Sequence, residues 1–132
     1  MGVRKSDGTI YNFTEPLKVN DEMNDFITWL QNNKEDLDPI KLATQAHLKF
    51  VTIHPFVDGN GRTARLLMNL ILIQNGYPPA VIKVSNRVEY IQAIEKAQNE
   101  NILDDFHMVI AKAVNESLDT YLEILDGDIV LI

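Results

Sequence analysis

The sequence predicts an all-α fold with a compact helical core and one small N-terminal β-hairpin. Apolar residues recur at helical spacing through most of the chain, and helix-stop signals separate these stretches. A single segment near the N-terminus has the turn and flanking residues of paired strands. With 132 residues, 45% of them hydrophobic, the chain can build one core and is too short for two. We therefore interpret residues 1–132 as a single domain, and leave open that they are a piece of a longer chain.

The hairpin is expected over residues 3–14. Its turn is Ser6-Asp7-Gly8, which lies between strand-forming residues on both sides. Two isolated strands are only marginally stable in water. The hairpin is therefore expected to pack against the helices or against a partner.

Two helices are expected next. From Val19, apolar residues follow at helical spacing on one face: Met23, Phe26, Ile27 and Leu30. Asp38 and Pro39 are then typical of an N-cap and a first helical turn. The inward face of this second helix is expected to comprise Leu42, Ala43, Ala46, Phe50 and Ile53. The helix should end near Ile53, because His54 precedes a proline and is disfavoured in the α region.

Three further helices complete the expected core. One opens at Arg62 and closes at Gly76, and its nearly apolar sequence predicts a central helix surrounded by others. Its apolar residues are Leu66, Leu67, Leu70, Ile71 and Ile73. Asn86 and Glu89 resemble a capping box for the next helix. The last helix is expected over 103–125, with an apolar face of Phe106, Val109, Ile110, Ala113, Tyr121 and Leu125.

Charge and composition restrict the classes of function. The formal net charge of −7 opposes binding to nucleic acid or to an anionic membrane, because both need a basic face. The absence of cysteine excludes disulfides, thiolate metal sites and cysteine nucleophiles, and fits a cytoplasmic chain. The longest apolar run, residues 66–73, is far shorter than the roughly 20 residues that cross a bilayer. Neither a membrane span nor a signal peptide is expected.

Residues 54–65, HPFVDGNGRTAR, have the residue types of phosphate chemistry. Free N–H groups at the start of a helix bind anions, and Gly59 and Gly61 allow a phosphate to approach the backbone. Arg62 and Arg65 occupy neighbouring positions on one helix face, where two guanidinium groups could clamp different phosphates. The segment therefore predicts a polyphosphate site.

Asp58 and His54 add a metal ligand and a base to this segment. Magnesium prefers one or two carboxylates together with phosphate oxygens and water. An imidazole, with an ordinary pKa of about 6.5, can accept the proton of an attacking hydroxyl near neutral pH. Taken singly, each of these residues is more often a structural or solvated one. His47 and His107 lie within helix patterns and are expected to be structural.

The string HPFVDGNGRTAR matches the Fic motif, H-P-F-x-[DE]-G-N-[GK]-R-x-x-R, at every defined position. On these residues the chain resembles the Fic family, and the likeness extends over about residues 3–125. The resemblance implies a Fic fold, in which a β-hairpin flap accompanies the helical core. It also implies transfer of AMP from ATP to a Ser, Thr or Tyr hydroxyl of a target protein, with release of pyrophosphate.

The resemblance implies a role for each motif residue. His54 would be the general base, Asp58 would hold Mg²⁺ on the α- and β-phosphates, and Phe56 would anchor the loop in the core. The other motif positions are implied to contact the nucleotide: Gly59, Asn60 and Gly61 around the phosphates, Arg62 along the phosphate chain, Arg65 at its far end, and Thr63 and Ala64 in the same span.

Outside the motif, the resemblance implies adenosine contacts and a flap. The adenosine contacts would be Tyr90 with Ile91 beside it, and either Gln98 or Asn99. The amide stays open between two positions, because the chain lacks the family's usual asparagine followed by a glycine and an acid. Flap residues are implied to cover the nucleotide and to dock the target segment by strand addition: Gly8, Thr9, Ile10 and Tyr11.

Regulation and reaction class stay open in the sequence. The family's inhibitory motif, [ST]-x-x-x-E-[GN], is not found, so an inhibitory helix would come from a partner or from a missing segment. A homodimer also stays open. The alternatives to AMP transfer are a Doc-like kinase, transfer of UMP or phosphocholine, and a non-catalytic adaptor that senses nucleotide. The kinase is disfavoured by Gly61, where that branch typically has a lysine.

Overall fold

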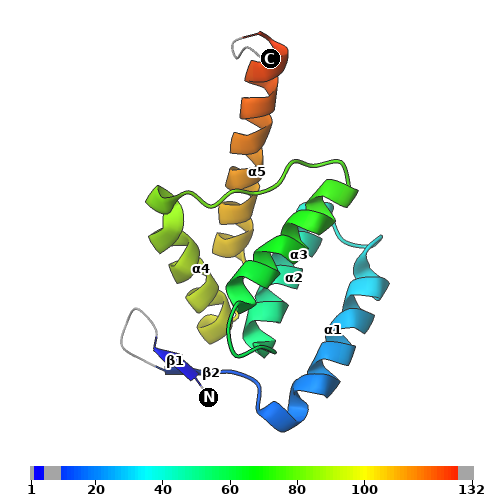
Figure 1. Ribbon diagram of the computed structural model, residues 1–132, viewed down its shortest axis with the longest axis vertical. Helices are drawn as coiled ribbons and strands as arrows, with labels where there is room; N and C mark the ends of the chain where they lie inside the picture. Colours follow the sequence, from blue (N-terminus) through cyan, green and yellow to red (C-terminus); the bar gives the residue numbers. More distant parts are fainter. Residues whose placement is uncertain (1, 5–9, 128–132) are drawn as a thin grey trace.

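The computed structural model describes residues 2–4 and 10–127. Five α-helices dominate this part of the chain, which confirms the predicted helical core (Figure 1). The elements in chain order are β1 (Gly2–Arg4), β2 (Ile10–Asn12), the 3-10 helix η1 (Pro16–Lys18), α1 (Val19–Asn33), α2 (Pro39–Ile53), α3 (Asn60–Gln74), the 3-10 helix η2 (Val84–Asn86), α4 (Arg87–Glu100) and α5 (Asp104–Leu125).

Helices α2 and α3 lie side by side at the centre of the molecule (Figure 1). Helix α1 packs on α2 from one side, and α5 packs on both α2 and α4 from the other. The predicted inward face of α2 is confirmed, since all five of its residues are buried. The largest side chains that close the core around it are Met68, Leu72, Phe106 and Ile110. None of the helices in the described residues combines the length and the apolarity that crossing a membrane requires.

Helix α2 begins and ends where local signals place its ends. The Asp38 carboxylate accepts hydrogen bonds from the backbone N–H groups of Ile40, at 2.9 Å, and Lys41, at 3.4 Å. Pro39 is the first helical residue. At the other end, His54 has left-handed backbone angles, φ 56° and ψ 59°, so the chain turns away from the helix axis there. Both predicted ends of α2 are confirmed.

We expect the Asp38→Ala substitution to lower the free energy of unfolding by about 1 kcal/mol, because it removes a side-chain N-cap. The measurement is the midpoint of urea denaturation. Asp36→Ala is the matched control, since it removes the same charge from the preceding turn, where the carboxylate is exposed. Equal losses in the two variants would show that charge, and not capping, is responsible.

Helix α3 is not surrounded by other helices, so that prediction is wrong. Leu66 is 71% exposed, and Leu70 and Ile73 are also exposed. The helix packs through Ala64, Met68, Ile71 and Leu72, of which Ile71 alone was among the apolar residues named from the sequence. Because nearly every residue after the first turn is apolar, the sequence pattern could not distinguish the buried face from the exposed one.

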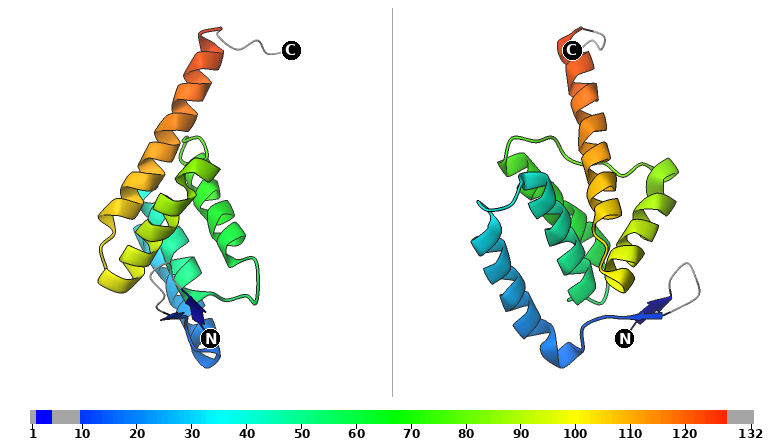
Figure 2. Two further views of the ribbon diagram at one scale, coloured as in Figure 1. Left: turned by 90° about the vertical axis from the view of Figure 1, so that its left-hand side faces the viewer. Right: turned by 180° about the vertical axis from the view of Figure 1, so that it is seen from behind.

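Other predicted positions are also wrong. Ile27 is exposed, and Trp29 packs against the core from α1 instead. Tyr121 and Leu125 are exposed because the last turns of α5 extend beyond the other helices (Figure 2). Asn86 makes no capping hydrogen bond with its side chain. The 3-10 turn η2 leads directly into α4, and the N–H of Arg87 donates to the carbonyl of Val84.

The two strands pair antiparallel, with Val3 opposite Tyr11. They lie close to the end of the molecule where α2 gives way to α3 (Figure 1). The turn between them, including Gly8 and Thr9, lies outside the described residues. The hairpin flap that covers a nucleotide stays a prediction.

Candidate active site

Residues 54–59 form the loop that joins α2 to α3, and its two ends have left-handed backbone angles. His54 is one of these positions and Gly59, with φ 82°, is the other. A β-carbon at Gly59 would be strained in this conformation, so glycine is needed there. The two turns direct the loop across the N-terminus of α3, where the free N–H groups of the helix lie.

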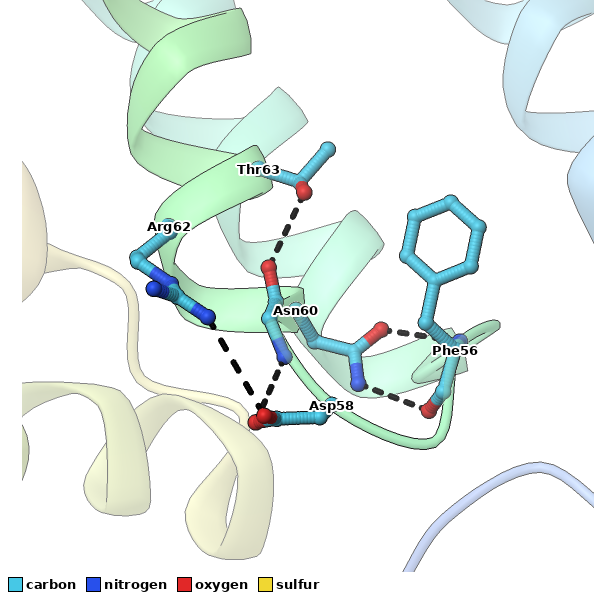
Figure 3. A network of polar contacts seen from close by, with 6 residues as sticks. Phe56, Asp58, Asn60, Arg62 and Thr63 are labelled. Carbon is cyan, nitrogen blue, oxygen red and sulfur yellow. Dashed lines mark hydrogen bonds and ion pairs between the residues drawn. The ribbon is translucent and has the colours of Figure 1, made fainter.

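Asn60 orders this loop from inside. Its Oδ1 accepts a hydrogen bond from the backbone N–H of Phe56 at 3.0 Å, and its Nδ2 donates to the Phe56 carbonyl at 2.8 Å (Figure 3). The side chain is 5% exposed. The resemblance implied that Asn60 cradles phosphates, but its side-chain amide is already paired with the loop. Only the backbone of Asn60, and not its side chain, therefore remains able to contact an anion.

Phe56 does not anchor the loop in the core, so that expectation is wrong. Its ring is 51% exposed and touches Phe50 at the rim of the core, with ring centroids 6.0 Å apart. The anchoring contact belongs to the backbone of Phe56, which Asn60 holds. A buried amide with two backbone partners can replace a buried ring in this role, since each polar atom is satisfied.

Asp58 and Arg62 lie on the open side of the loop (Figure 3). One oxygen of Asp58 accepts a hydrogen bond from the N–H of Gly59 at 2.8 Å. The other lies 4.0 Å from Arg62 Nη2, in an ion pair whose side chains are 93% and 78% exposed. Such an exposed pair contributes little to stability. Both side chains are therefore available to a ligand.

Thr63 and Ala64 are not placed as nucleotide contacts. The Thr63 hydroxyl donates to the Gly59 carbonyl at 2.9 Å (Figure 3). Ala64 lies on the buried face of α3, with 0% of its surface exposed. Neither side chain lines the cavity that the other motif residues form. These two positions support the loop and the helix packing.

Most of the other predicted residues of the motif and of α4 line one cavity of about 480 Å³ between the motif loop and α4. From the motif these are His54, Asp58, Gly59, Asn60, Gly61, Arg62 and Arg65, and from α4 they are Tyr90, Ile91 and Gln98. Asn99 does not line the cavity. Gln98 does, and its Nε2 donates to the Thr52 hydroxyl at 3.2 Å. The geometry thus favours Gln98 for the amide position that the sequence left open.

Sequence reasoning missed Arg87, which lines the same cavity from the first turn of α4. It lies one helical turn before Tyr90, and that spacing is the one signal that could have placed it in the site. Within the described residues, no carboxylate forms a salt bridge with Arg65 or Arg87. Three arginines line this cavity together with the carboxylates of Asp58 and Glu95, so the cavity has a surplus of positive charge in a chain of net charge −7.

The ring of Phe13 stacks flat on the imidazole of His54, with ring centroids 3.8 Å apart and an interplanar angle of 6°. Phe13 directly follows β2, so this contact joins the strand pair to the motif loop. Burial lowers the pKa of His54 below its ordinary value, because desolvation disfavours the charged imidazolium. His54 is therefore a neutral proton acceptor at neutral pH, with one face of its ring covered.

The chain is similar to relatives of known name over most of its length. The chain is 38% identical over 123 residues to the protein adenylyltransferase fic-1 of Caenorhabditis elegans, which covers 91% of the chain and 24% of that relative. It is 46% identical over 101 residues to the protein adenylyltransferase Fic of Aedes aegypti, covering 76% of the chain and 20% of the relative. The chain thus spans a quarter or less of the length of these relatives.

Solved structures agree with this relation. A Fic domain-containing signaling protein from Bacteroides thetaiotaomicron superposes with a TM-score of 0.86 at 26% identity, covering 96% of this chain and 53% of that one. Fic-1 of C. elegans, residues 134–508, superposes with a TM-score of 0.81 at 38% identity, covering 88% and 35%. The sequence model of the Fic/DOC family matches residues 2–72, more than half of the chain. The chain therefore belongs to the Fic/DOC family.

Proposed function

We propose that the chain transfers AMP from ATP to a Ser, Thr or Tyr hydroxyl of a target protein and releases pyrophosphate. The observation that carries this proposal is the cavity, which joins a neutral base, an exposed carboxylate and three arginines to an apolar wall on α4. Relatives with this motif are named protein adenylyltransferases. ATP as the substrate and a protein as the target both belong to this proposal.

His54 is the general base in this proposal. Its imidazole accepts the proton of the target hydroxyl as the hydroxyl oxygen forms a bond to the α-phosphorus. The bond between that phosphorus and the oxygen bridging to the β-phosphate breaks, and its electron pair leaves with pyrophosphate. The lowered pKa of His54 favours this role, because a neutral imidazole is needed at the start of the step.

The phosphates are bound by the N-terminus of α3 and by the arginines. The N–H groups of the first helical turn and the positive end of the helix dipole favour an anion there. Arg62 and Arg65 lie along α3, and Arg87 faces them from α4. Guanidinium groups aimed at a polyphosphate also stabilise the negative charge that develops on the leaving pyrophosphate.

Asp58 fits a magnesium ion that arrives with the nucleotide. The described residues contain no cluster of three or more His, Cys, Asp or Glu side chains that could hold a metal alone. Magnesium in nucleotide sites instead takes one or two carboxylates and completes its shell with phosphate oxygens and water. When bound, it would neutralise charge on the phosphates beside Asp58. The carboxylate is oriented for this by its hydrogen bond from Gly59.

The adenosine half of the cavity is proposed to lie against α4. Ile91 and Ile94 supply apolar surface there. Gln98 donates through Nε2 to Thr52, which leaves its Oε1 to accept a hydrogen bond from an amino group of the base. The strand pair would cover the nucleotide and add a strand of the target, since a free strand edge can bind an extended segment. Phe13 supports this arrangement because it couples β2 to His54.

A labelling experiment tests the reaction class. The chain is incubated with magnesium and a cell lysate, once with α-³²P-ATP and once with γ-³²P-ATP. AMP transfer predicts protein bands that carry the α label alone. Bands that carry the γ label alone would establish the kinase instead, and ATP binding without either label would establish the adaptor.

We expect Phe13→Leu to shift the acid limb of the pH–rate profile to higher pH. Removal of the stacked ring exposes the imidazole, so the pKa of His54 rises toward its ordinary value and the base is protonated at a higher pH. Because the pKa rises at most to its ordinary value of about 6.5, at least half of the imidazole stays neutral at pH 6.5, and AMP transfer there should fall by up to about twofold. NMR titration of the His54 imidazole measures the pKa directly. Phe56→Leu, on the exposed ring of the same loop, is the control and should leave the limb in place.

A further inference from the structure

His47 is the one histidine of the described residues that is fully buried, with 0% of its surface exposed. It lies on α2 and meets α4 and α5 through aromatic contacts. Its ring is perpendicular to that of Tyr90, with centroids 5.6 Å apart, and packs edge-on against Phe106 at 5.1 Å. Its Nε2 lies 2.6 Å from the Tyr90 hydroxyl oxygen. A polar group placed this deep is costly unless it is paired, so the contact with Tyr90 holds it in place.

The Tyr90 hydroxyl links His47 to the nucleotide cavity. Arg65 Nη1 donates to the same hydroxyl oxygen across 3.5 Å, which is a long hydrogen bond. An arginine can only donate, so the tyrosine oxygen accepts from it. We assign the tyrosine proton to the bond with His47 Nε2, which lies within hydrogen-bond distance of the same hydroxyl. This requires a neutral imidazole. Burial, followed by the charge of Arg65, lowers the pKa of His47 from 6.5 to about 4, so the ring is neutral at neutral pH.

The direction of these bonds assigns the ring proton of His47 to Nδ1. That nitrogen is buried and has no hydrogen-bond partner on another described residue, while the backbone of His47 itself lies close enough to raise the pKa of the ring. A buried N–H that pairs only within its own residue is poorly satisfied, which costs free energy. The side chain thus keeps a weakly paired donor while its other nitrogen orients Tyr90, which favours a role beyond packing.

The Arg65 side chain borders two cavities. It lines the nucleotide cavity and also an adjoining cavity of about 350 Å³, which is bounded by residues 80–84. On one side, a β-carbon added to Gly61 would lie 3.4 Å from Arg65 Nη1, so glycine leaves room for the guanidinium there. On the other side, the Tyr90 hydroxyl holds the same nitrogen. Without an oriented hydroxyl, the long side chain gains access to the adjoining cavity.

We propose that His47 is a positioning residue, which acts through the Tyr90 hydroxyl to hold the Arg65 guanidinium at the phosphate end of the nucleotide cavity. The inference rests on the proposed function, because it takes Arg65 as the ligand of the outer phosphates. Its consequence is selective: ATP, which carries those phosphates, depends on His47, and AMP, which lacks them, does not.

The test measures ATP and AMP binding to the whole chain by calorimetry. His47→Leu should weaken ATP binding about three- to tenfold, the size of one neutral hydrogen bond, and leave AMP binding unchanged, since His47 does not line the cavity. Tyr90→Phe should weaken ATP binding by a similar factor. His47→Gln should restore ATP binding, since its amide oxygen can accept the tyrosine proton. His107→Leu is the control, because His107 is a half-buried helix histidine that does not line the cavity.

A double-mutant cycle separates positioning from general damage to the fold. In an Arg65→Ala background, His47→Leu should have no further effect on ATP binding. Equal losses for ATP and AMP, or an undiminished effect of His47→Leu without Arg65, would overturn the inference while the labelling experiment still stood. If the wild-type chain bound AMP and ATP equally, Arg65 would not hold the outer phosphates, and the proposed phosphate site would fail together with the inference.

Discussion

Replacement of His54 by alanine is expected to lower the rate of AMP transfer by about 10²- to 10⁴-fold, the contribution of a positioned general base. The side chain stands at the end of α2, neutral and stacked on Phe13, beside the N-terminus of α3. It contributes no charge to phosphate binding. The affinity for ATP should therefore change little, and the loss should fall on the chemical step.

Single-turnover transfer from α-³²P-ATP and calorimetric ATP binding measure the two quantities separately. His107→Ala is the matched control, because it removes an imidazole from α5 without touching the cavity. A loss of transfer that simply followed a loss of ATP affinity would assign His54 to nucleotide binding. A variant with nearly full activity would remove His54 from the mechanism.

The ends of α2 could be predicted because they depend on a few neighbouring residues. These ends are set by local sterics and local hydrogen bonds of Asp38, Pro39 and the His54–Pro55 step, which can be predicted directly from the sequence. The burial of α3 could not be predicted in the same way. Its apolar residues surround the helix, so the exposed positions of Leu66 and Leu70 depend on which neighbours the tertiary fold supplies.

The features of the motif loop also fall into those that the sequence could predict and those that depend on the tertiary fold. The motif predicted which residue types meet at the cavity, and the structure brings His54, Asp58 and the arginines together there. The motif did not predict that the Asn60 side chain would form both of its hydrogen bonds with the backbone of Phe56, because those bonds depend on how the loop folds. Arg87 was missed because α4 reaches the loop only through the packing of α5 and α2. His47 was expected to be structural, and its contact with Tyr90 depends on the same packing.

His47 should also determine how stability depends on pH. In the unfolded chain its imidazole titrates with an ordinary pKa of 6.5, while burial and Arg65 hold the folded pKa at about 4. Between these values the unfolded state binds a proton that the folded state does not, so stability falls as the pH falls. The loss should begin below pH 6.5 and reach about 2 kcal/mol at pH 5. Above pH 6.5 this group should have no effect on the pH dependence.

His47→Gln should flatten this acid limb, because glutamine keeps the acceptor for Tyr90 and does not titrate. The charged or titratable groups around His47 are Tyr90 on α4 and Arg65 on α3. Burial raises the pKa of Tyr90, so the phenol stays neutral between pH 4 and 7. His54 and His107 also have lowered pKa values, so a smaller loss should persist in the variant. Urea denaturation at pH 5 and pH 7 measures the difference. If wild type and variant lost the same free energy between these two pH values, His47 would have to be solvated in the folded chain, and the buried contact with Tyr90 could not hold.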